Sequence, residues 1–568
     1  MKNVKRIAIF LLLAVFMFSL TACSFGKKIV YSSYYESDYE DSGDADESSS
    51  SGKKTTKKQS GKKDEDSGDE DEDSDDNDSE DSKDSKDEKK TTSKTKKTTK
   101  KADTSKTTGS SDPDTSDDDV VDTDSTDYPR SSNPGALSTP MKNAKFDSKA
   151  EEMRKAIVNA KDTIKAKGTT YYVSNNGSDS NNGKSPDKAW KTVSRVASAA
   201  IQSGDAVLFE RGSVFRTSAV LTLKSGVSYG AYGTGVKPCI YGSRKNYATA
   251  EWKSLGNNLW ELKSAFTGDV GLIVFNHGEA YGRLKDSQSD LKNNYDFYVG
   301  SPSSMTTKVI VYLKKAPSTY WDIEIGEDRH ILLGNGDNIT IENLTLKYTG
   351  AHAFHAGSCK NVTIRNCEVG FCGGSYLLNA GTNSYVRYGN GIELMGTDVD
   401  ILVENNWVYQ IYDSGITHQG EGGGPKNFMV RNNLVEYCGM GCIEYWHVKG
   451  TPITNVTYEG NLLRFAGYGV GSQRPKLYQT ACVESNGSYN EATNFVIKNN
   501  IFELSAYYVF DSSNSAKTPP TLSGNTFVQP KGRWLGSYNG DKVKFDDNVL
   551  TAIQNNWGDK TATVIFAD

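Results

Sequence analysis

The stretch that decides the fold is ITIENLTL, at residues 339–346. Apolar and polar residues alternate on either side of a central asparagine, and this period of two is typical of β-strands. The same pattern recurs at VTIRNCEV (362–369), ILVENNWV (401–408), FMVRNNLV (428–435), VTYEGNLL (456–463) and FVIKNNIF (495–502), and more weakly at 520–527 and 543–550. A repeat of this kind predicts a solenoid, in which each copy supplies part of one coil.

The spacing of the central residue gives the length of a coil. Most intervals between copies are 23–28 residues, which is the period of a parallel β-solenoid, and two are 39 residues. The longer intervals hold insertions at 373–389 and 471–479, which we expect to loop out on one face. The central column is Asn343, Asn366, Asn405, Asn432, Gly460, Asn499, Gly524 and Asp547. Because asparagine tolerates left-handed backbone and bonds through its amide, we expect a bend with an asparagine ladder at this column.

Further motifs precede the repeats. The segment YYVSNNGSD (171–179) is followed by Asn182-Gly183, Pro186, WKT (190–192) and GDAVLF (204–209). Together with the repeats, these motifs resemble the pectate-lyase-like right-handed parallel β-helix superfamily over about residues 169–560. The resemblance implies an all-β, right-handed parallel β-helix. Known members include polysaccharide lyases, glycosidases, epimerases and non-catalytic surface proteins, so the fold alone does not decide the reaction.

Two segments depart from the repeat but belong to the same predicted domain, residues 141–568. Residues 147–167 have the pattern of an amphipathic helix that ends at Gly168, and we expect it to cover the open end of the first coil. Its apolar face consists of Met153, Ile157, Ala160 and Ile164. Residues 247–330 contain many short alternating runs and three tryptophans, and they predict a small β insertion.

The N-terminus predicts export. A basic start (1–6), an apolar run (7–18) and the sequence LTAC (20–23) make a secretory signal. The LTAC ending resembles the bacterial lipoprotein signal, which implies acylation of Cys23. The chain would then be tethered by lipid to the outer face of a bacterial membrane, at the cell surface.

Charge separates the next segment from the globular domain. Residues 24–140 hold 19 Lys and Arg against 32 Asp and Glu in low-complexity order, which predicts a disordered acidic stalk. Residues 141–568 hold 44 basic and 40 acidic residues. We expect no nucleic-acid partner because no basic stripe stands out, and we expect a monomer. Seven cysteines remain after Cys23, and an odd number argues against a full disulfide framework.

A second strand follows each repeat copy, and its outward positions carry the candidate chemistry. The outward column is predicted to run His355, Glu393, Thr417, Glu444, Glu484 and Phe510. Neighbouring coils lie about 4.8 Å apart, so Glu444 and Glu484 are separated by about 4.8 Å and Glu393 and Glu444 by about 9.6 Å. Carboxylates about 5–5.5 Å apart suit retaining glycoside hydrolysis, and separations of about 6.5–9.5 Å suit inverting hydrolysis. A solvated charged face is the alternative interpretation.

These residues favour a glycoside hydrolase acting on extracellular polysaccharide. Glu393, Glu444 and Glu484 are its predicted catalytic carboxylates, and Asp413, which would otherwise cap a turn, is a further candidate. The predicted substrate-binding residues are Trp446, as an exposed sugar platform, with Gln419, Tyr445, His447, Arg474 and His355.

Two other functions remain open. A polysaccharide lyase or epimerase would use a base such as His418, and Ca²⁺ bound by the three glutamates would neutralise a uronate carboxylate. A non-catalytic glycan-binding or structural surface module would form no product. No zinc motif, phosphate loop or serine nucleophile elbow is present, and no metal site is predicted. We expect His277, His330 and His352 to be ordinary bend or surface residues.

Overall fold

The computed structural model of this protein describes residues 143–567, apart from 301–306, 380–383, 421, 475–479, 487–490 and 513–517. The predicted signal, Cys23 and the acidic stalk lie outside the described residues. Within the described part of the chain, no helix combines the length and the apolar character needed to cross a membrane.

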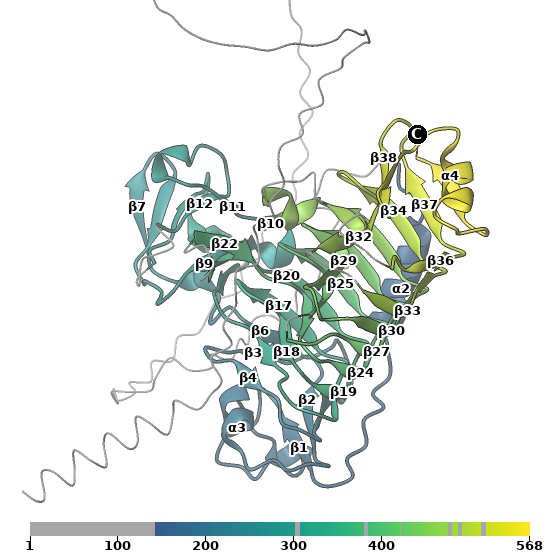
Figure 1. The fold of residues 1–568 in the computed structure, drawn as a ribbon. Coiled ribbons are helices and arrows are strands. Elements are labelled where there is room, and N and C mark those ends of the chain that lie inside the picture. The colour runs from purple at the N-terminus through teal and green to yellow at the C-terminus, as the bar shows by residue number, and fades with distance from the viewer. Residues whose placement is uncertain are drawn as a thin grey trace, which may run out of the picture. The chain divides into compact units, whose positions relative to one another are not determined.

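Three sheets of ten strands form the walls of the coil, and their strands run parallel apart from the last pair of the third sheet (Figure 1). The first wall consists of β1 (Thr170–Val173), β2 (Ala206–Glu210), β5 (Ser228–Tyr232), β16 (Ile339–Glu342), β19 (Lys360–Arg365), β24 (Val399–Glu404), β27 (Lys426–Arg431), β30 (Ile453–Glu459), β33 (Ala492–Lys498) and β36 (Thr521–Ser523). The second wall consists of β3 (Val214–Arg216), β6 (Cys239–Tyr241), β17 (Thr345–Thr349), β20 (Glu368–Cys372), β25 (Trp407–Ile411), β28 (Leu434–Cys438), β31 (Leu462–Ala466), β34 (Ile501–Ser505), β37 (Thr526–Gln529) and β40 (Thr563–Phe566).

The third wall carries the candidate site. It consists of β4 (Leu221–Thr222), β15 (Leu332–Leu333), β18 (Phe354–Gly357), β23 (Ile392–Met395), β26 (Ile416–Gly420), β29 (Gly441–His447), β32 (Ala481–Asn486), β35 (Phe510–Ser512), β38 (Trp534–Tyr538) and β39 (Asp541–Lys544). Each coil takes one strand from each wall, and the alternate apolar residues of all three walls meet in one continuous core. The predicted parallel β-solenoid is confirmed.

The bend between the first and second walls has the predicted backbone, but the ladder lies one residue further on. Asn343, Asn366, Asn405, Asn432 and Asn499 all have positive φ, as do Gly460 and Gly524. The buried ladder is formed by the next residue of each copy, namely Asn406, Asn433, Asn461, Asn500 and Asn525. In each rung, an amide oxygen accepts hydrogen bonds from the backbone and the side chain of the preceding asparagine. The left-handed residues themselves lie outside this ladder; Asn343, for example, donates to the backbone carbonyl of Lys161.

The last weak copy is not a coil. Residues 543–550 contain the end of β39 and the start of the helix α4 (Val549–Asn555), and Asp547 forms an ion pair with Lys531 on the surface. The ladder instead ends at Asp559, whose carboxylate accepts from the amide of Asn525. The carboxylate takes the place of another asparagine and stops the stack.

The N-terminal helix differs from the prediction in length and in place. α2 (Asp147–Val158) covers only the first part of 147–167, and its Ile157 packs with Trp407 outside the core, against the second wall. The aromatic side chains Trp407 and Tyr409 of that wall belong to the apolar cluster that the helix joins. The first coil packs instead on α3 (Val193–Ser198), whose apolar residues join the core.

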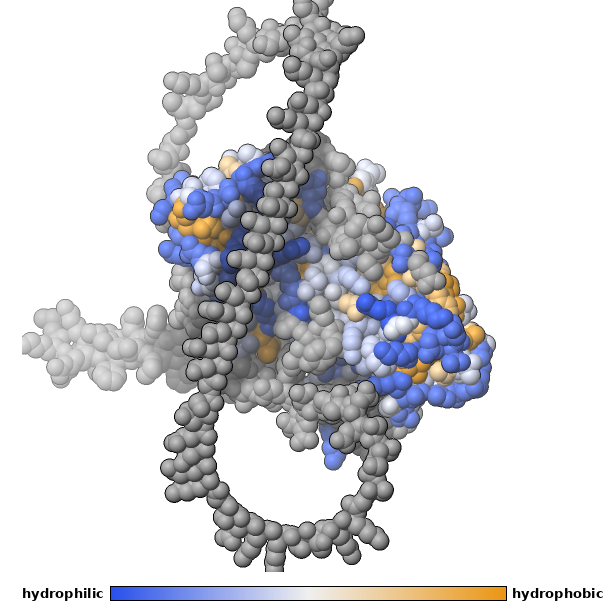
Figure 2. Space-filling model, turned by 90° about the horizontal axis from the view of Figure 1, so that it is seen from above, coloured by the Kyte–Doolittle hydropathy of each residue, from blue (hydrophilic) through white to orange (hydrophobic). Residues whose placement is uncertain are grey.

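Residues 247–330 form a β insertion between β6 and β15. One sheet of the insertion contains β7 (Trp252–Gly256), β8 (Leu259–Leu262), β11 (Arg283–Leu284), β12 (Asp296–Tyr298) and β13 (Ile310–Tyr312), and a second contains β9 (Val270–Phe275), β10 (Ala280–Tyr281) and β14 (Ile323–Glu327). A separate hairpin, β21 (Ser375–Asn379) and β22 (Ser384–Tyr388), lies in the first of the two long repeat intervals. From above, the described surface is largely hydrophilic with smaller hydrophobic areas (Figure 2).

Candidate functional site

The third wall aligns the predicted outward column. His355, Glu393, Thr417, Glu444 and Glu484 are direct partners on β18, β23, β26, β29 and β32. Adjacent strands are about 4.8 Å apart, so each of these side chains lies one rung from the next. Strand stacking therefore gathers residues that are far apart in the sequence.

The last member of the column was assigned wrongly. Phe510 pairs with Val483 and packs in the core, so Asp511, the next residue, continues the column beyond Glu484. The segment before β35 contains several apolar residues in a row, and a shift of one residue exchanges the two faces of a strand. Asp511 is thus a functional candidate that the sequence interpretation missed.

The column is buried, not solvated. Glu444 is 1% exposed, Glu484 is 3% exposed and Asp511 is 9% exposed. One carboxylate oxygen of Glu444 and one of Glu484 are buried without a hydrogen-bond partner. A solvated charged face would leave such oxygens in contact with water, so these exposed fractions do not fit that alternative interpretation.

Four carboxylates and one guanidinium meet at this point. We name Asp413, Glu444, Glu484 and Asp511 the carboxylate cluster. Asp413 stands just before β26, and its Oδ1 accepts from Nε of Arg474 at 2.9 Å. Arg474 follows the short 3₁₀-helix η7 (Gly469–Gln473) in the second long repeat interval. This insertion therefore supplies the positive charge that faces the cluster.

Burial and mutual repulsion perturb the pKa values of two members. Burial, and after it repulsion by Asp413, raises the pKa of Glu444 to about 7, although Ser414, Arg474 and Thr417 partly oppose the shift. Burial also raises the pKa of Glu484 well above its ordinary value, with additional repulsion from Glu444 and Asp511. Neighbouring carboxylates that repel one another titrate as a unit, so the Glu444–Glu484 pair retains a proton near neutral pH.

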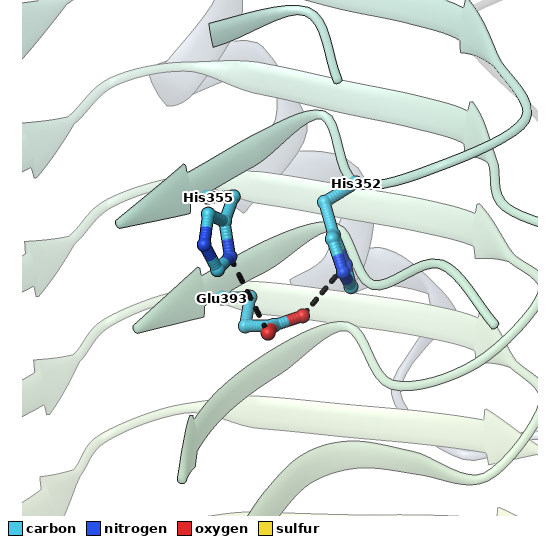
Figure 3. A group of neighbouring side chains, drawn as sticks. All are labelled: His352, His355 and Glu393. Atoms are coloured by element: carbon cyan, nitrogen blue, oxygen red, sulfur yellow. Dashed lines mark ion pairs between the residues drawn. The ribbon is translucent and has the colours of Figure 1, made fainter. Parts of the chain in front are cut away.

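Glu393 belongs to a different environment, two rungs from Glu444. Its Oε2 lies 2.7 Å from Nδ1 of His352, and its Oε1 lies 3.4 Å from Nδ1 of His355 (Figure 3). Asn390 also donates to Oε2 at 2.8 Å. Burial acts to raise the pKa of Glu393, but the two histidines hold it well below its ordinary value. Glu393 is therefore an ionised carboxylate in a histidine environment.

Two histidines that were expected on bends or on the surface belong to this group. His330 stacks on His352 with ring centroids 4.9 Å apart, and on His355 with centroids 5.1 Å apart. His352 is itself buried. Both His330 and His352 stand two residues before a buried strand position of the third wall. An alignment of the third-wall strands that included the two residues before each strand would have placed His330 and His352 in one column and so revealed this group.

Three other predicted residues lie inside the coil. His418, Tyr445 and His447 occupy the inward face of the third wall, opposite to Glu444. The ring of His418 bonds to His447 at 2.9 Å and to the hydroxyl of Tyr458 at 2.6 Å. Burial holds the pKa of His418 well below its ordinary value. The strand pleat therefore turns these three side chains away from the outward face that carries the carboxylate cluster.

Trp446 and Gln419 do lie on the outward face, two residues beyond the carboxylate column. They are direct partners on β29 and β26, and Trp446 also pairs with Asn486 on β32. Trp446 is only 6% exposed, so it is not the exposed platform that the sequence suggested. Trp446 lies two residues beyond Glu444 on the same face of β29, at one edge of the carboxylate cluster.

Comparison with known families agrees with this architecture. The family model described as "Right handed beta helix region" matches residues 328–463 and 384–556. Residues 328–556 are a right-handed β-helix region. With the three walls of parallel strands, this match confirms the predicted all-β, right-handed parallel β-helix. No curated protein matches the sequence.

Several solved structures are similar to this chain at low sequence identity. XylC in complex with xylose is 12% identical over 66% of this chain and 76% of that chain, with a TM-score of 0.40. Pectate lyase Pel9A is 12% identical over 64% and 70%, with a TM-score of 0.37. Alginate lyase from Paenibacillus sp. str. FPU-7 is 12% identical over 60% and 87%, with a TM-score of 0.35. Similarity at this level does not identify a reaction.

Proposed function

We propose that this β-helix protein is a glycoside hydrolase that acts on extracellular polysaccharide at the carboxylate cluster. The observation that carries the proposal is the pairing of Glu444 with Glu484 on adjacent strands. Burial and mutual repulsion raise the pKa of both side chains, to about 7 for Glu444. A shared proton gives one acid to protonate the leaving oxygen and one carboxylate to act on the sugar carbon.

The spacing of the pair predicts the stereochemistry. Strands one rung apart place the backbones of the two glutamates about 4.8 Å from each other, close to the carboxyl separation of about 5–5.5 Å in retaining enzymes. Glu444 is the better proton donor, because its pKa of about 7 lies near the working pH. The pair shares one proton, and in the form that reacts Glu444 carries this proton while Glu484 is ionised and acts as the nucleophile. The Asp413–Arg474 pair orients the substrate beside it. Glu393 has no proton-transfer role in this scheme.

Lyase or epimerase chemistry is the second candidate, and Arg474 is the observation that favours it. A guanidinium beside several carboxylates would neutralise a uronate directly, and the carboxylates would hold Ca²⁺. The predicted base of this route, His418, lies inside the coil and faces away from the cluster.

Product analysis separates the candidates. The full chain would be incubated with neutral and uronate-containing polysaccharides in H₂¹⁸O, with and without Ca²⁺. The masses of the reaction products would be measured by mass spectrometry. We expect one ¹⁸O at each new reducing end and, by NMR, retention of the anomeric configuration. Unsaturated products without added water would overturn hydrolysis in favour of a lyase. Binding without any product would favour a non-catalytic glycan-binding module.

We also propose that the protein is anchored at the bacterial cell surface through lipid on Cys23, with the acidic segment as its stalk. The LTAC motif supports this proposal. Expression in bacteria fed a labelled fatty acid should label the chain and place it in the membrane fraction. The Cys23→Ser variant should lose the label, and equal labelling of both chains would contradict the proposal.

A further inference from the structure

We propose that His352, His355 and Glu393, which we name the histidine–glutamate cluster, bind a divalent transition-metal ion of the zinc class. The inference concerns a group of residues outside the carboxylate cluster, and it does not depend on the proposed hydrolase activity. His352 stands just before β18, His355 lies in β18, and Glu393 lies in β23. Register between the two strands sets His355 directly beside Glu393.

The donor atoms have the separation that a metal requires. The three residues offer one ligand atom each, and these atoms all lie within 4.8 Å of one another. The two Nδ1–carboxylate distances are 2.7 and 3.4 Å. Ligand atoms of a tetrahedral zinc ion, with bonds of about 2.0 Å, lie about 3.3 Å apart. Figure 3 shows both imidazole edges directed at the one carboxylate. Small side-chain movements would therefore complete the coordination.

Two contacts compete for Nδ1 of His352. The N–H of Asn390 points at Nδ1 of His352 at 2.9 Å, while Oε2 of Glu393 lies 2.7 Å from the same nitrogen. A protonated Nδ1 would oppose the N–H of Asn390, and an unprotonated Nδ1 would oppose the carboxylate. Such buried conflicts are rare in native proteins. A cation bound by the ring and the carboxylate would remove the repulsion between the Nδ1 lone pair and Oε2. Because the cation uses that lone pair, the N–H of Asn390 would then turn to another acceptor.

A further donor and an outer support complete the site. Nδ1 of His330 is buried without a hydrogen-bond partner, and its ring stacks on both cluster histidines. Asn390 holds Glu393 through its side-chain amide while its own Oδ1 accepts from the backbone of Ser414. Metal ligands are characteristically fixed by outer hydrogen bonds of this kind. His330 would extend the link to three successive coils.

The chemistry of the donors selects the class of metal. Mg²⁺ and Ca²⁺ prefer six to eight oxygen ligands, and this cluster offers two ring nitrogens and one carboxylate. Imidazole with carboxylate suits zinc and the neighbouring first-row ions. All seven cysteines of the described chain are buried, and none belongs to the histidine–glutamate cluster. The site therefore offers imidazole and carboxylate ligands without a thiolate.

Zinc binding to the full chain tests this inference. Protein would be titrated against Zn²⁺ with a competing chromophoric chelator, in millimolar Mg²⁺ to occupy the acidic N-terminal segment. We expect one tight zinc per chain. Glu393→Gln, which preserves shape, should weaken binding at least 100-fold. Asn390→Ala, which removes only the outer support, should weaken it about 10- to 100-fold.

A matched control uses the other histidine–carboxylate pair. Nδ1 of His277 lies 2.7 Å from Asp322, and this pair has no third ligand within the described residues. His277→Ala should leave the zinc affinity unchanged. Zinc should also raise the melting temperature of the wild-type chain but not that of Glu393→Gln. Lack of tight zinc binding, or equal binding by wild type and Glu393→Gln, would overturn the proposal. The cluster would then be an ordinary histidine–glutamate ion pair.

Discussion

Glu444 and Glu484 are direct partners on parallel strands, and each keeps one buried carboxylate oxygen without a hydrogen-bond partner. Burying a carboxylate without compensation costs stability, and burying two side by side costs more. The β-helix does not need them, because an apolar pair at the same positions would pack without repulsion. An arrangement that opposes folding is typical of a functional site.

The first prediction concerns activity. Glu444→Gln keeps the shape of the side chain but removes its proton, so we expect turnover to fall about 10²- to 10⁴-fold. Circular dichroism should be unchanged. The matched control is Glu459→Gln on β30, where the glutamate forms a partly exposed ion pair with Lys498. Initial rates on the substrate found by product analysis measure the effect. Full activity in Glu444→Gln would exclude this residue as the acid.

The second prediction concerns pH and stability. Folding raises the pKa of Glu444 from 4.5 to about 7, so the folded state binds the proton more tightly than the unfolded state. Tighter proton binding by the folded state therefore adds to the free energy of unfolding. This addition is complete below pH 4.5 and disappears as the pH rises to about 7. Wild type should therefore lose on the order of 3 kcal/mol relative to Glu444→Gln over this range. Urea unfolding at several pH values measures the difference. Parallel curves for the two chains would show that Glu444 does not titrate in this way.

The outward column illustrates what the sequence could reveal. Alternation in the second strands placed Glu393, Glu444 and Glu484 on one face, and the register of the sheet agrees. Asp511 was missed because consecutive apolar residues before it obscure the strand parity. The burial of the column could not be foreseen either, because it depends on segments outside the repeat pattern.

The histidines show a second limit. His352 lies before its strand, where the chain turns, and no alternation constrains a turn residue. Its contact with Glu393 arises because two coils stack in register, although the two residues are 41 positions apart in the sequence (393 − 352 = 41). The asparagine ladder was predicted one residue too early for a similar reason. A repeat identifies a recurring asparagine but not the direction in which its side chain points.

The third prediction concerns that ladder. Asn433 accepts from the backbone and amide of Asn406 and donates to Asn461, all within the core. Asn433→Ala leaves several buried polar groups unpaired, so we expect a loss on the order of 3 kcal/mol in unfolding free energy. The control is Asn427→Gly near the start of β27, in an exposed row of asparagines, where glycine suits the positive φ. Its expected change is within about 0.5 kcal/mol. Similar urea midpoints for the two variants would contradict the structural role of the buried ladder.

The last prediction tests the charge that faces the carboxylate cluster. Arg474 lowers the pKa of Glu444 and forms an ion pair with Asp413, so Arg474→Gln should raise the pKa of Glu444 above about 7. The general acid must be protonated to act, and the basic limb of the activity profile follows its pKa. That limb should therefore move to higher pH, while maximal turnover falls because the substrate is held less well. Arg431→Gln, on the exposed side of the first wall, should leave the profile in place. A fall in turnover with no movement of the basic limb would mean that Arg474 only binds substrate and does not tune the acid.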